Sequence, residues 1–271
     1  MMEQPAWLNI LDYPFASQWI KIQGDAIHFI DEGKGTPVLF LHGSPLWSYA
    51  YRNVIKELLG ECRCIALDQL GFGLSEKPQD GDYSLEAQLD RIKRLIDESN
   101  LRKFILVADG NASTLALKLM SDRPEHIKNL LLLHPKEHTP SPLWKRMLNL
   151  QHGWEVRKGI KASLHPKNKL SFDEYLPYRR PFWHREDRVA LGKRIEPFAT
   201  FSFPVELGKR ICIIWGQGSK KKEREYWQEI SSAGQQEVFP AVKSLPMVEL
   251  PSAIAMQVRI FLLALAEDKK A

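Results

Sequence analysis

The chain contains few of the residues that build metal sites and disulfide frameworks. No histidine follows His184 in the 271 residues, so the last part of the chain lacks an imidazole to act as a base or a ligand. There are three cysteines, and two of them, Cys62 and Cys64, are alternate residues of one expected strand. Their side chains would stand about 6.6 Å apart on one face, too far for a disulfide bond. This usage argues against a disulfide framework and a zinc site.

Long apolar segments are absent as well. No apolar run reaches the roughly 18 residues that span a bilayer, and the N-terminus, with Glu3 and Trp7, lacks the basic and apolar regions of a signal peptide. Hydrophobic residues make up 44% of the chain and charged residues 26%, which is typical of a soluble globular protein. We therefore expect a cytoplasmic protein with no membrane partner.

The positive charge is modest, at +5, and local. The runs Lys220-Lys221-Lys222 and Arg179-Arg180 accompany no basic helical stripe and no recognition motif, so we expect no nucleic acid partner and read these runs as a solvated rim. The lysine run also follows an expected strand, which would place it to attract an anionic ligand or an acidic carrier protein.

Short apolar runs alternate with amphipathic stretches, which predicts a parallel sheet with crossover helices. The alternation stops between residues 136 and 203, a segment rich in Pro, Trp, Tyr, Arg and His. We interpret this segment as a cap over the carboxyl edge of the sheet, where ligands bind in open α/β sheets. The predicted core is residues 1–135 and 204–271. The cap aromatics either line an apolar pocket or pack on the core: Trp144, Trp154, Tyr175, Tyr178, Phe182 and Trp183.

Several motifs point to one known family. The stretch from His28 to Gly33 precedes an apolar strand that ends in His42-Gly43-Ser44-Pro45, and a D-x-x-G-x-G-x-S loop follows at 68–75. Together with Trp47-Ser48-Tyr49, these motifs resemble the α/β-hydrolase fold, in particular its haloalkane dehalogenase and epoxide hydrolase branch, over nearly the whole chain. The resemblance implies an α/β protein with a mostly parallel eight-stranded sheet, flanked by helices and with a helical lid inserted after strand six.

In that fold a strained turn, small-x-nucleophile-x-small, lifts one side chain into the pocket. The resemblance aligns this turn with residues 108–112, which places Gly110 at the nucleophile position. A shift by one residue places Asp109 there instead, but Val107 and Asn111 would then occupy the two crowded positions. We favour the first alignment.

The resemblance also implies positions for the acid and the base. Ser219 occupies the usual acid position after strand seven, and His134 stands at the alternative one after strand six. Ser244 aligns with the base. With Gly110 these positions describe a degenerate triad, and the loss of a general base alone removes about 10²–10⁴-fold of rate.

Other polar residues are expected at the same edge. Asp109 would orient His134 as a general base for proton abstraction, elimination or cyclisation, or else His134 bonds a loop carbonyl and Asp109 caps the next helix. His42-Gly43-Ser44 either keeps oxyanion donors facing the pocket or is a structural turn. The predicted oxyanion and pocket residues are His42, Gly43, Ser44, Trp47, Asn111 and Trp183.

The sequence therefore predicts a dehalogenase-like fold that uses its core–cap pocket for non-hydrolytic work on a small apolar or carrier-bound molecule. Cofactor-free catalysis of the lyase, cyclase or isomerase type and ligand binding without turnover both remain open. Two alternatives are a hydrolase with Asp109 as nucleophile and a pseudoenzyme that acts as a protein-binding scaffold. No cofactor and no metal are expected.

Overall fold

The computed structural model describes residues 4–8, 12–136, 154–192, 210–231 and 234–268. Eight strands form one sheet in the order β1-β2-β4-β3-β5-β6-β7-β8. β2 pairs antiparallel with β1 and β4, and the remaining pairs are parallel. The strands are β1 (Gln18–Ile22), β2 (Asp25–Gly33), β3 (Pro37–Leu41), β4 (Arg63–Leu67), β5 (Phe104–Asp109), β6 (Ile127–Leu133), β7 (Ile211–Gly216) and β8 (Gln235–Phe239).

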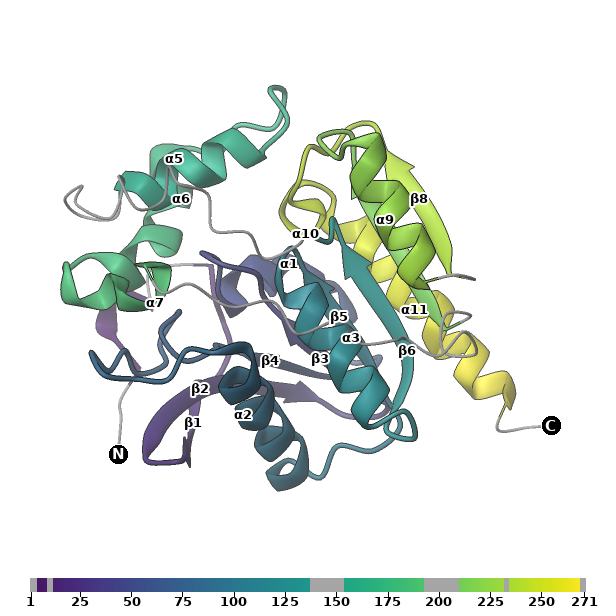
Figure 1. Cartoon of the computed structure of the whole chain (residues 1–271), viewed down its shortest axis with the longest axis horizontal. Helices are drawn as coiled ribbons and strands as arrows, with labels where there is room; N and C mark the ends of the chain where they lie inside the picture. Colours follow the sequence, from purple (N-terminus) through teal and green to yellow (C-terminus); the bar gives the residue numbers. More distant parts are fainter. Residues whose placement is uncertain (1–3, 9–11, 137–153, 193–209, 232–233, 269–271) are drawn as a thin grey trace.

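Helices cover both faces of the sheet (Figure 1). α1 and α11 pack against each other, and α2 packs against α3. The helices of the core are α1 (Arg52–Leu58), α2 (Leu85–Glu98), α3 (Ala112–Asp122), α9 (Lys221–Ser231), α10 (Pro246–Glu249) and α11 (Pro251–Asp268), with the 3-10 turns η1 (Ala6–Leu8) and η2 (Ser48–Tyr51).

The expected α/β-hydrolase fold is thus confirmed, and the reason lies in the strand sequences. Every residue of β5 and of β7 is buried, as continuous apolar runs predict for strands covered on both faces. The last strand, β8, has the polar sequence Gln-Gln-Glu-Val-Phe and lies at the sheet edge, largely exposed. α2 begins with a side-chain cap, because the Ser84 side chain accepts a hydrogen bond from the Ala87 N–H.

The insert between β6 and β7 is helical, as expected. It lies beside one end of the sheet in Figure 1. α6 begins with a capping box in which Ser171 and Glu174 satisfy each other's backbone N–H groups. Trp144 lies outside the described residues, and so does residue 203, the predicted C-terminal boundary of the cap. The described elements are α5 (Trp154–Ser163), α6 (Phe172–Arg179), η4 (Arg180–Phe182), η5 (Glu186–Arg188) and α7 (Val189–Gly192).

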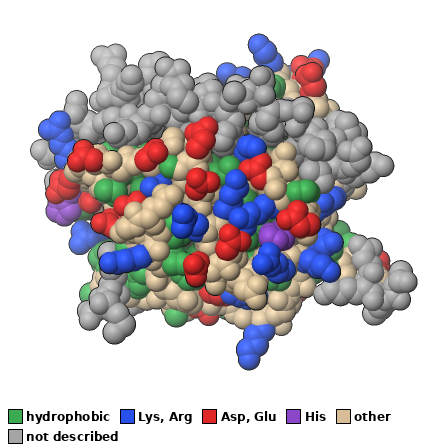
Figure 2. All heavy atoms as spheres, turned by 60° about the horizontal axis from the view of Figure 1, so that its bottom comes forward, with side chains coloured by type: hydrophobic (Ala, Val, Ile, Leu, Met, Phe, Trp, Pro, Cys, Tyr) green, Lys and Arg blue, Asp and Glu red, His purple; other side chains and the backbone are tan. Residues whose placement is uncertain are grey.

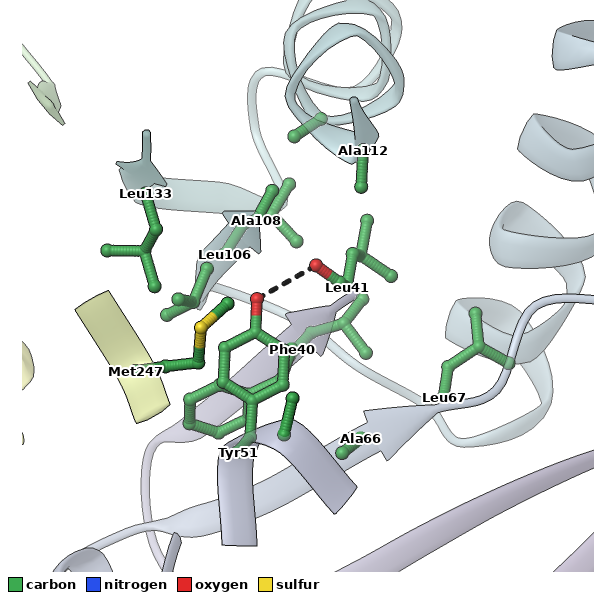
Figure 3. Packing of buried hydrophobic residues seen from close by; sticks show 14 of the residues in the cluster. Phe40, Leu41, Tyr51, Ala66, Leu67, Leu106, Ala108, Ala112, Leu133 and Met247 are labelled. Carbon is green, nitrogen blue, oxygen red and sulfur yellow. Dashed lines mark hydrogen bonds between the residues drawn. The ribbon is translucent and has the colours of Figure 1, made fainter. Parts of the chain in front are cut away.

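The core beneath the carboxyl edge is anchored by a buried tyrosine. The hydroxyl of Tyr51 donates to the Leu41 carbonyl over 2.9 Å, while its ring packs beside Leu106, Ala108 and Met247 (Figure 3). Because Leu41 is the last residue of β3, this bond fixes the start of the turn that follows. The turn carries the predicted oxyanion residues.

The cysteines are free thiols, but one expectation about them is wrong. The sulfurs of Cys62 and Cys64 lie 3.6 Å apart, closer than the spacing of alternate strand residues. The reason is that Cys62 precedes β4, so ideal strand geometry does not apply to it. Both residues are buried.

Candidate functional site

The turn between β5 and α3 has a glycine at its sharpest point. Gly110 has a φ of +54°, a left-handed backbone conformation that costs glycine little. A Cβ atom built on Gly110 would meet no other atom within 4 Å. Gly110, which the resemblance aligns with the nucleophile position, thus has no side chain and has open space around its Cα, and Asp109 is the last residue of β5.

Asp109 is buried directly beside this turn, with 3% of its surface exposed. Among the described residues its Oδ1 atom has no hydrogen-bond partner. Burial raises the pKa of Asp109 to about 7, although the charge of Lys136 and a hydrogen bond from the Gly43 backbone oppose the rise. Close to neutral pH this carboxyl group can therefore both give and take a proton.

The turns that follow β3 and β5 lock together. The Ser44 N–H donates to Oδ1 of Asn111 over 2.8 Å. A Cβ atom on Gly43 would stand 2.8 Å from the carbonyl oxygen of Asp109 and 3.0 Å from Oδ1 of Asn111, so only glycine permits this approach. The amide oxygen of Asn111 thus occupies the backbone donor that the resemblance assigns to an oxyanion.

His134 does not pair with Asp109, and that prediction is wrong for the described residues. Nδ1 of His134 accepts a hydrogen bond from the Gly216 N–H at 3.2 Å, and the ring lies edge-on to Trp215 of β7. The cause is the backbone: a φ of +44° at His134 accompanies a ring turned toward β7, away from Asp109 on β5. Burial and the charge of Lys136 lower the pKa of His134 to about 3, so the imidazole is neutral.

The alternative roles expected for His134 and Asp109, a bond to a loop carbonyl and a cap of the next helix, also differ from the structure. The ring nitrogen Nδ1 of His134 accepts a hydrogen bond from a backbone N–H, and it does not bond a loop carbonyl. The residue before α3 is Asn111, which makes no side-chain cap, so a capping role for Asp109 is absent from this described turn. Asp109 remains the one carboxyl group in the site with a pKa near neutrality.

Ser219 and Ser244 lie in adjoining loops, as their alignment with an acid and a base implies. The Ser219 hydroxyl donates to the Gly216 carbonyl over 2.9 Å, and Arg224 donates to the same hydroxyl. The Gly218 N–H donates to the Lys243 carbonyl, and a Cβ on Gly218 would stand 3.0 Å from Oγ of Ser244. The loops that carry Ser219 and Ser244 are thus in contact, and the acid and base positions that the resemblance implies for these two serines stay a prediction.

Three of the predicted pocket residues have structural contacts. His42 is fully buried and its Nε2 atom accepts the Gln69 N–H, which favours the structural-turn interpretation of this segment. Trp47 is also fully buried, and its Nε1–H donates to the Pro177 carbonyl in α6, which joins core and cap. Trp183 is half-buried and stacks against the Arg180 guanidinium.

One buried pair was not singled out from the sequence. Nδ1 of His28 lies 2.8 Å from Oδ2 of Asp68, which also accepts the Leu74 N–H. Burial raises the pKa of Asp68, but His28 and the other donors outweigh it, so the pKa lies below its ordinary value. The signal was the D-x-x-G-x-G-x-S motif, where a Cβ on Gly73 would collide with the Asp68 carboxylate. The pair holds the loops around β4 together.

Two further findings concern the described residues alone. No group of three or more His, Cys, Asp or Glu side chains lies close enough together there to hold a metal ion. Within those same ranges, none of the helices has the length and apolar character needed to cross a bilayer.

Comparison of the sequence with known proteins also points to the α/β-hydrolase fold. A family model described as alpha/beta hydrolase fold matches residues 36–176. "Haloalkane dehalogenase 2" of Mycobacterium tuberculosis is 33% identical over 120 residues, which cover 44% of this chain and 42% of that protein. "Cis-3-alkyl-4-alkyloxetan-2-one decarboxylase" of Shewanella oneidensis is 36% identical over 138 residues, 48% of this chain and 43% of the relative. The matched segments thus span less than half the length of these two relatives.

Solved structures extend the similarity of the fold to nearly the full chain. The crystal structure of haloalkane dehalogenase DbeA from Bradyrhizobium elkani matches with a TM-score of 0.78 at 20% identity, over 94% of this chain and 99% of that one. A putative ancestral haloalkane dehalogenase matches with a TM-score of 0.76 at 22% identity, over 94% and 100% of the two chains. The chain belongs to the α/β-hydrolase fold family, and over part of its length it is similar to haloalkane dehalogenases.

Proposed function

We propose that this chain lacks a working nucleophile–acid–histidine triad and uses the pocket between core and cap for a non-hydrolytic role on a small apolar molecule. The observation that carries the proposal is Gly110, the bare residue at the left-handed apex of the turn. A covalent mechanism needs an attacking atom at this apex, and a glycine has none.

The neighbouring groups support the same proposal. The resemblance aligns Ser244 with the base and Ser219 with the acid, and a serine hydroxyl is a poor general base at neutral pH. The Ser44 N–H is already bonded to Asn111, which leaves one backbone donor fewer for a developing oxyanion. Nucleophile, base and part of the electrostatic stabilisation are therefore missing together.

The relatives indicate the kind of molecule and one form of non-hydrolytic turnover. Their names refer to haloalkanes and to alkyl-substituted oxetan-2-ones, both small and largely apolar. The decarboxylase is a lyase, so a protein of this branch can carry out turnover without net hydrolysis. In this chain Asp109, with a pKa near 7, is the residue best suited to exchange a proton with such a molecule. Binding without turnover is the alternative if Asp109 does not reach it.

Hydrolysis with Asp109 as nucleophile is the second candidate. It is favoured by the dehalogenase relatives and by the unpartnered Oδ1 atom. Two observations weigh against hydrolysis. Asp109 lies before the apex of the turn. Nδ1 of His134 accepts the Gly216 N–H, which leaves that nitrogen unable to take a proton. An acidic carrier protein at Lys220–Lys222 stays a prediction; these three lysines are exposed, and Lys221 pairs with Glu225.

The test compares the wild type with Asp109→Asn, using the exposed α2 residue change Asp90→Asn as the matched control. Halide release from chloroalkanes, ester hydrolysis and carbon dioxide release from dialkyl oxetan-2-ones are measured, together with thermal shifts. We expect no halide or ester turnover from any of the three proteins, and stabilisation by an apolar ligand, about 2.7 kcal/mol at 100 times its dissociation constant. Hydrolytic turnover that Asp109→Asn abolishes and Asp90→Asn preserves would overturn the proposal in favour of the second candidate.

A further inference from the structure

A hollow of about 530 Å³ lies at the amino-terminal edge of the sheet, at the opposite end of the strands from Gly110. Residues 35–37 and the apolar Leu265 of α11 line part of it. The other three lining residues are Arg102, Lys103 and Lys128. No acidic side chain lines the hollow among the described residues.

The sheet order explains why these cations converge. β3, β5 and β6 are consecutive parallel strands, so their first residues meet at one edge. Residues 35–37 lead into β3, Lys103 immediately precedes β5, and Lys128 is the second residue of β6. The register places Phe104 opposite Ile127, which brings the two lysines onto neighbouring strand ends.

Of the three cations that line the hollow, Arg102 has the Asp97 carboxylate within electrostatic reach. Within the described part of the chain, neither Lys103 nor Lys128 has a carboxylate partner. Nη1 of Arg102 contacts Nε2 of His126 at 2.6 Å, and that contact adds no negative charge. The nearby Asp97 carboxylate is bound by both terminal nitrogens of Arg123.

A fourth cation, Arg210, adds to the positive charge near the hollow. Nε of Arg210 donates to the carbonyl of Lys128 over 2.7 Å, so its guanidinium is held beside β6 by a backbone oxygen. Figure 2 looks onto this side of the molecule and shows Lys and Arg side chains gathered there, with acidic side chains between them. Like charges held this close repel one another in water and are stabilised when an anion binds between them.

The backbone of Lys103 adds an independent observation. Its φ is +53°, a left-handed conformation that disfavours a long side chain. A glycine at this position would avoid the strain, and the chain instead carries a lysine that lines the hollow. Strained non-glycine residues of this kind cluster at ligand-binding sites.

The geometry points to a second binding site, for a small phosphorylated molecule, at this amino edge. Lys103 and Lys128 would bind the phosphate oxygens as point charges, and Arg102 would add a planar pair of donors. The less polar part of the ligand would lie against Leu265 and Pro37. This site lies at the opposite end of the strands from Gly110, and it stands whether or not the proposed function holds.

Inorganic pyrophosphate is the probe, and isothermal titration calorimetry at low ionic strength is the measurement. We expect saturable binding to the whole chain and a dissociation constant raised about tenfold in Lys103→Ala/Lys128→Ala. The matched control, Lys21→Ala/Lys158→Ala, removes the same charge from exposed positions on β1 and α5 and should change the constant less than about twofold. Equal losses in the two double variants, or no saturable binding to the wild type, would overturn the site.

Lys103→Gly separates binding from folding. It removes the ammonium group and relieves the left-handed backbone, so its unfolding midpoint should rise while pyrophosphate affinity falls. A midpoint that rises with affinity unchanged would contradict the proposal. So would a single-stranded oligonucleotide that displaces pyrophosphate and binds more tightly per phosphate, because the partner would then be a nucleic acid.

Discussion

Oδ1 of Asn111 accepts the backbone N–H of Ser44 over 2.8 Å, and this contact joins the end of β3 to the start of α3. We expect Asn111→Ala to lower the free energy of unfolding by about 1 kcal/mol, because the bond is lost and a backbone donor loses its partner. Urea denaturation measures the change. Asn53→Ala on α1 is the control and should be at least as stable as the wild type, because the Asn53 side chain makes no hydrogen bond to the described residues. Equal stability of Asn111→Ala and the wild type would show that the contact contributes nothing.

Two glycines of the site should respond differently to the same change. Gly110→Ala places a methyl group in open space, so it carries only the cost of a left-handed alanine, about 1 kcal/mol. Gly43→Ala places its methyl group 2.8 Å from the Asp109 carbonyl oxygen and should cost about 2–3 kcal/mol. Thermal and urea denaturation of the two variants check the order. A Gly43→Ala protein more stable than Gly110→Ala would contradict the close approach of the two turns.

The raised pKa of Asp109 predicts a specific pH dependence of stability. The folded state binds its proton up to about pH 7, whereas the unfolded carboxyl releases it near pH 3.8. The native state therefore holds more protons in this window, and the contribution of Asp109 to stability falls as the pH rises, by up to about 4 kcal/mol. Asp109→Asn mimics the protonated form and should match the wild type near pH 4 and exceed it at pH 8.

Subtracting the two unfolding curves isolates Asp109, since every other titrating group is common to both proteins. Asp90→Asn, at an exposed position of α2, should leave the difference flat across the same range. A difference between wild type and Asp109→Asn that does not vary between pH 4 and pH 8 would mean that the carboxyl is ionised throughout.

The lowered pKa of His134 predicts the opposite pH dependence of stability. Its pKa is lowered from 6.5 to about 3 on folding, so the unfolded state binds the extra proton, and its contribution to stability is lost as the pH falls between these values. His134→Asn keeps a residue that tolerates the left-handed backbone and removes the titration. Its unfolding free energy should therefore fall less than that of the wild type on acidification. An unchanged acid dependence would contradict the burial of this imidazole.

Much of the fold could be predicted from the sequence, because it depends on local patterns. The apolar runs that form β5 and β7 read as buried strands, and the loss of alternation after β6 marked the insert. Glycine at residue 110 also has a conformational meaning that can be read without coordinates, since few other residues accept a positive φ.

The contacts within the site were harder to predict, because each depends on the third dimension. Nothing in the sequence indicates that the Asn111 amide would take the Ser44 N–H, and histidine carries no strong preference for the left-handed backbone that accompanies the His134 ring turned toward β7. Strand adjacency correctly brought the ends of β5 and β6 together, but adjacency does not determine which way a side chain turns.

The bond from Trp47 to the Pro177 carbonyl has a consequence for how α6 could move. In a continuing helix that carbonyl would accept the N–H of the residue four positions later, but Pro181 has none to give, and the core indole takes its place. Lifting α6 would strand both a buried donor and a buried acceptor. The bond between Trp47 and Pro177 therefore ties α6 to the core, and any movement of this helix away from the core has to break it.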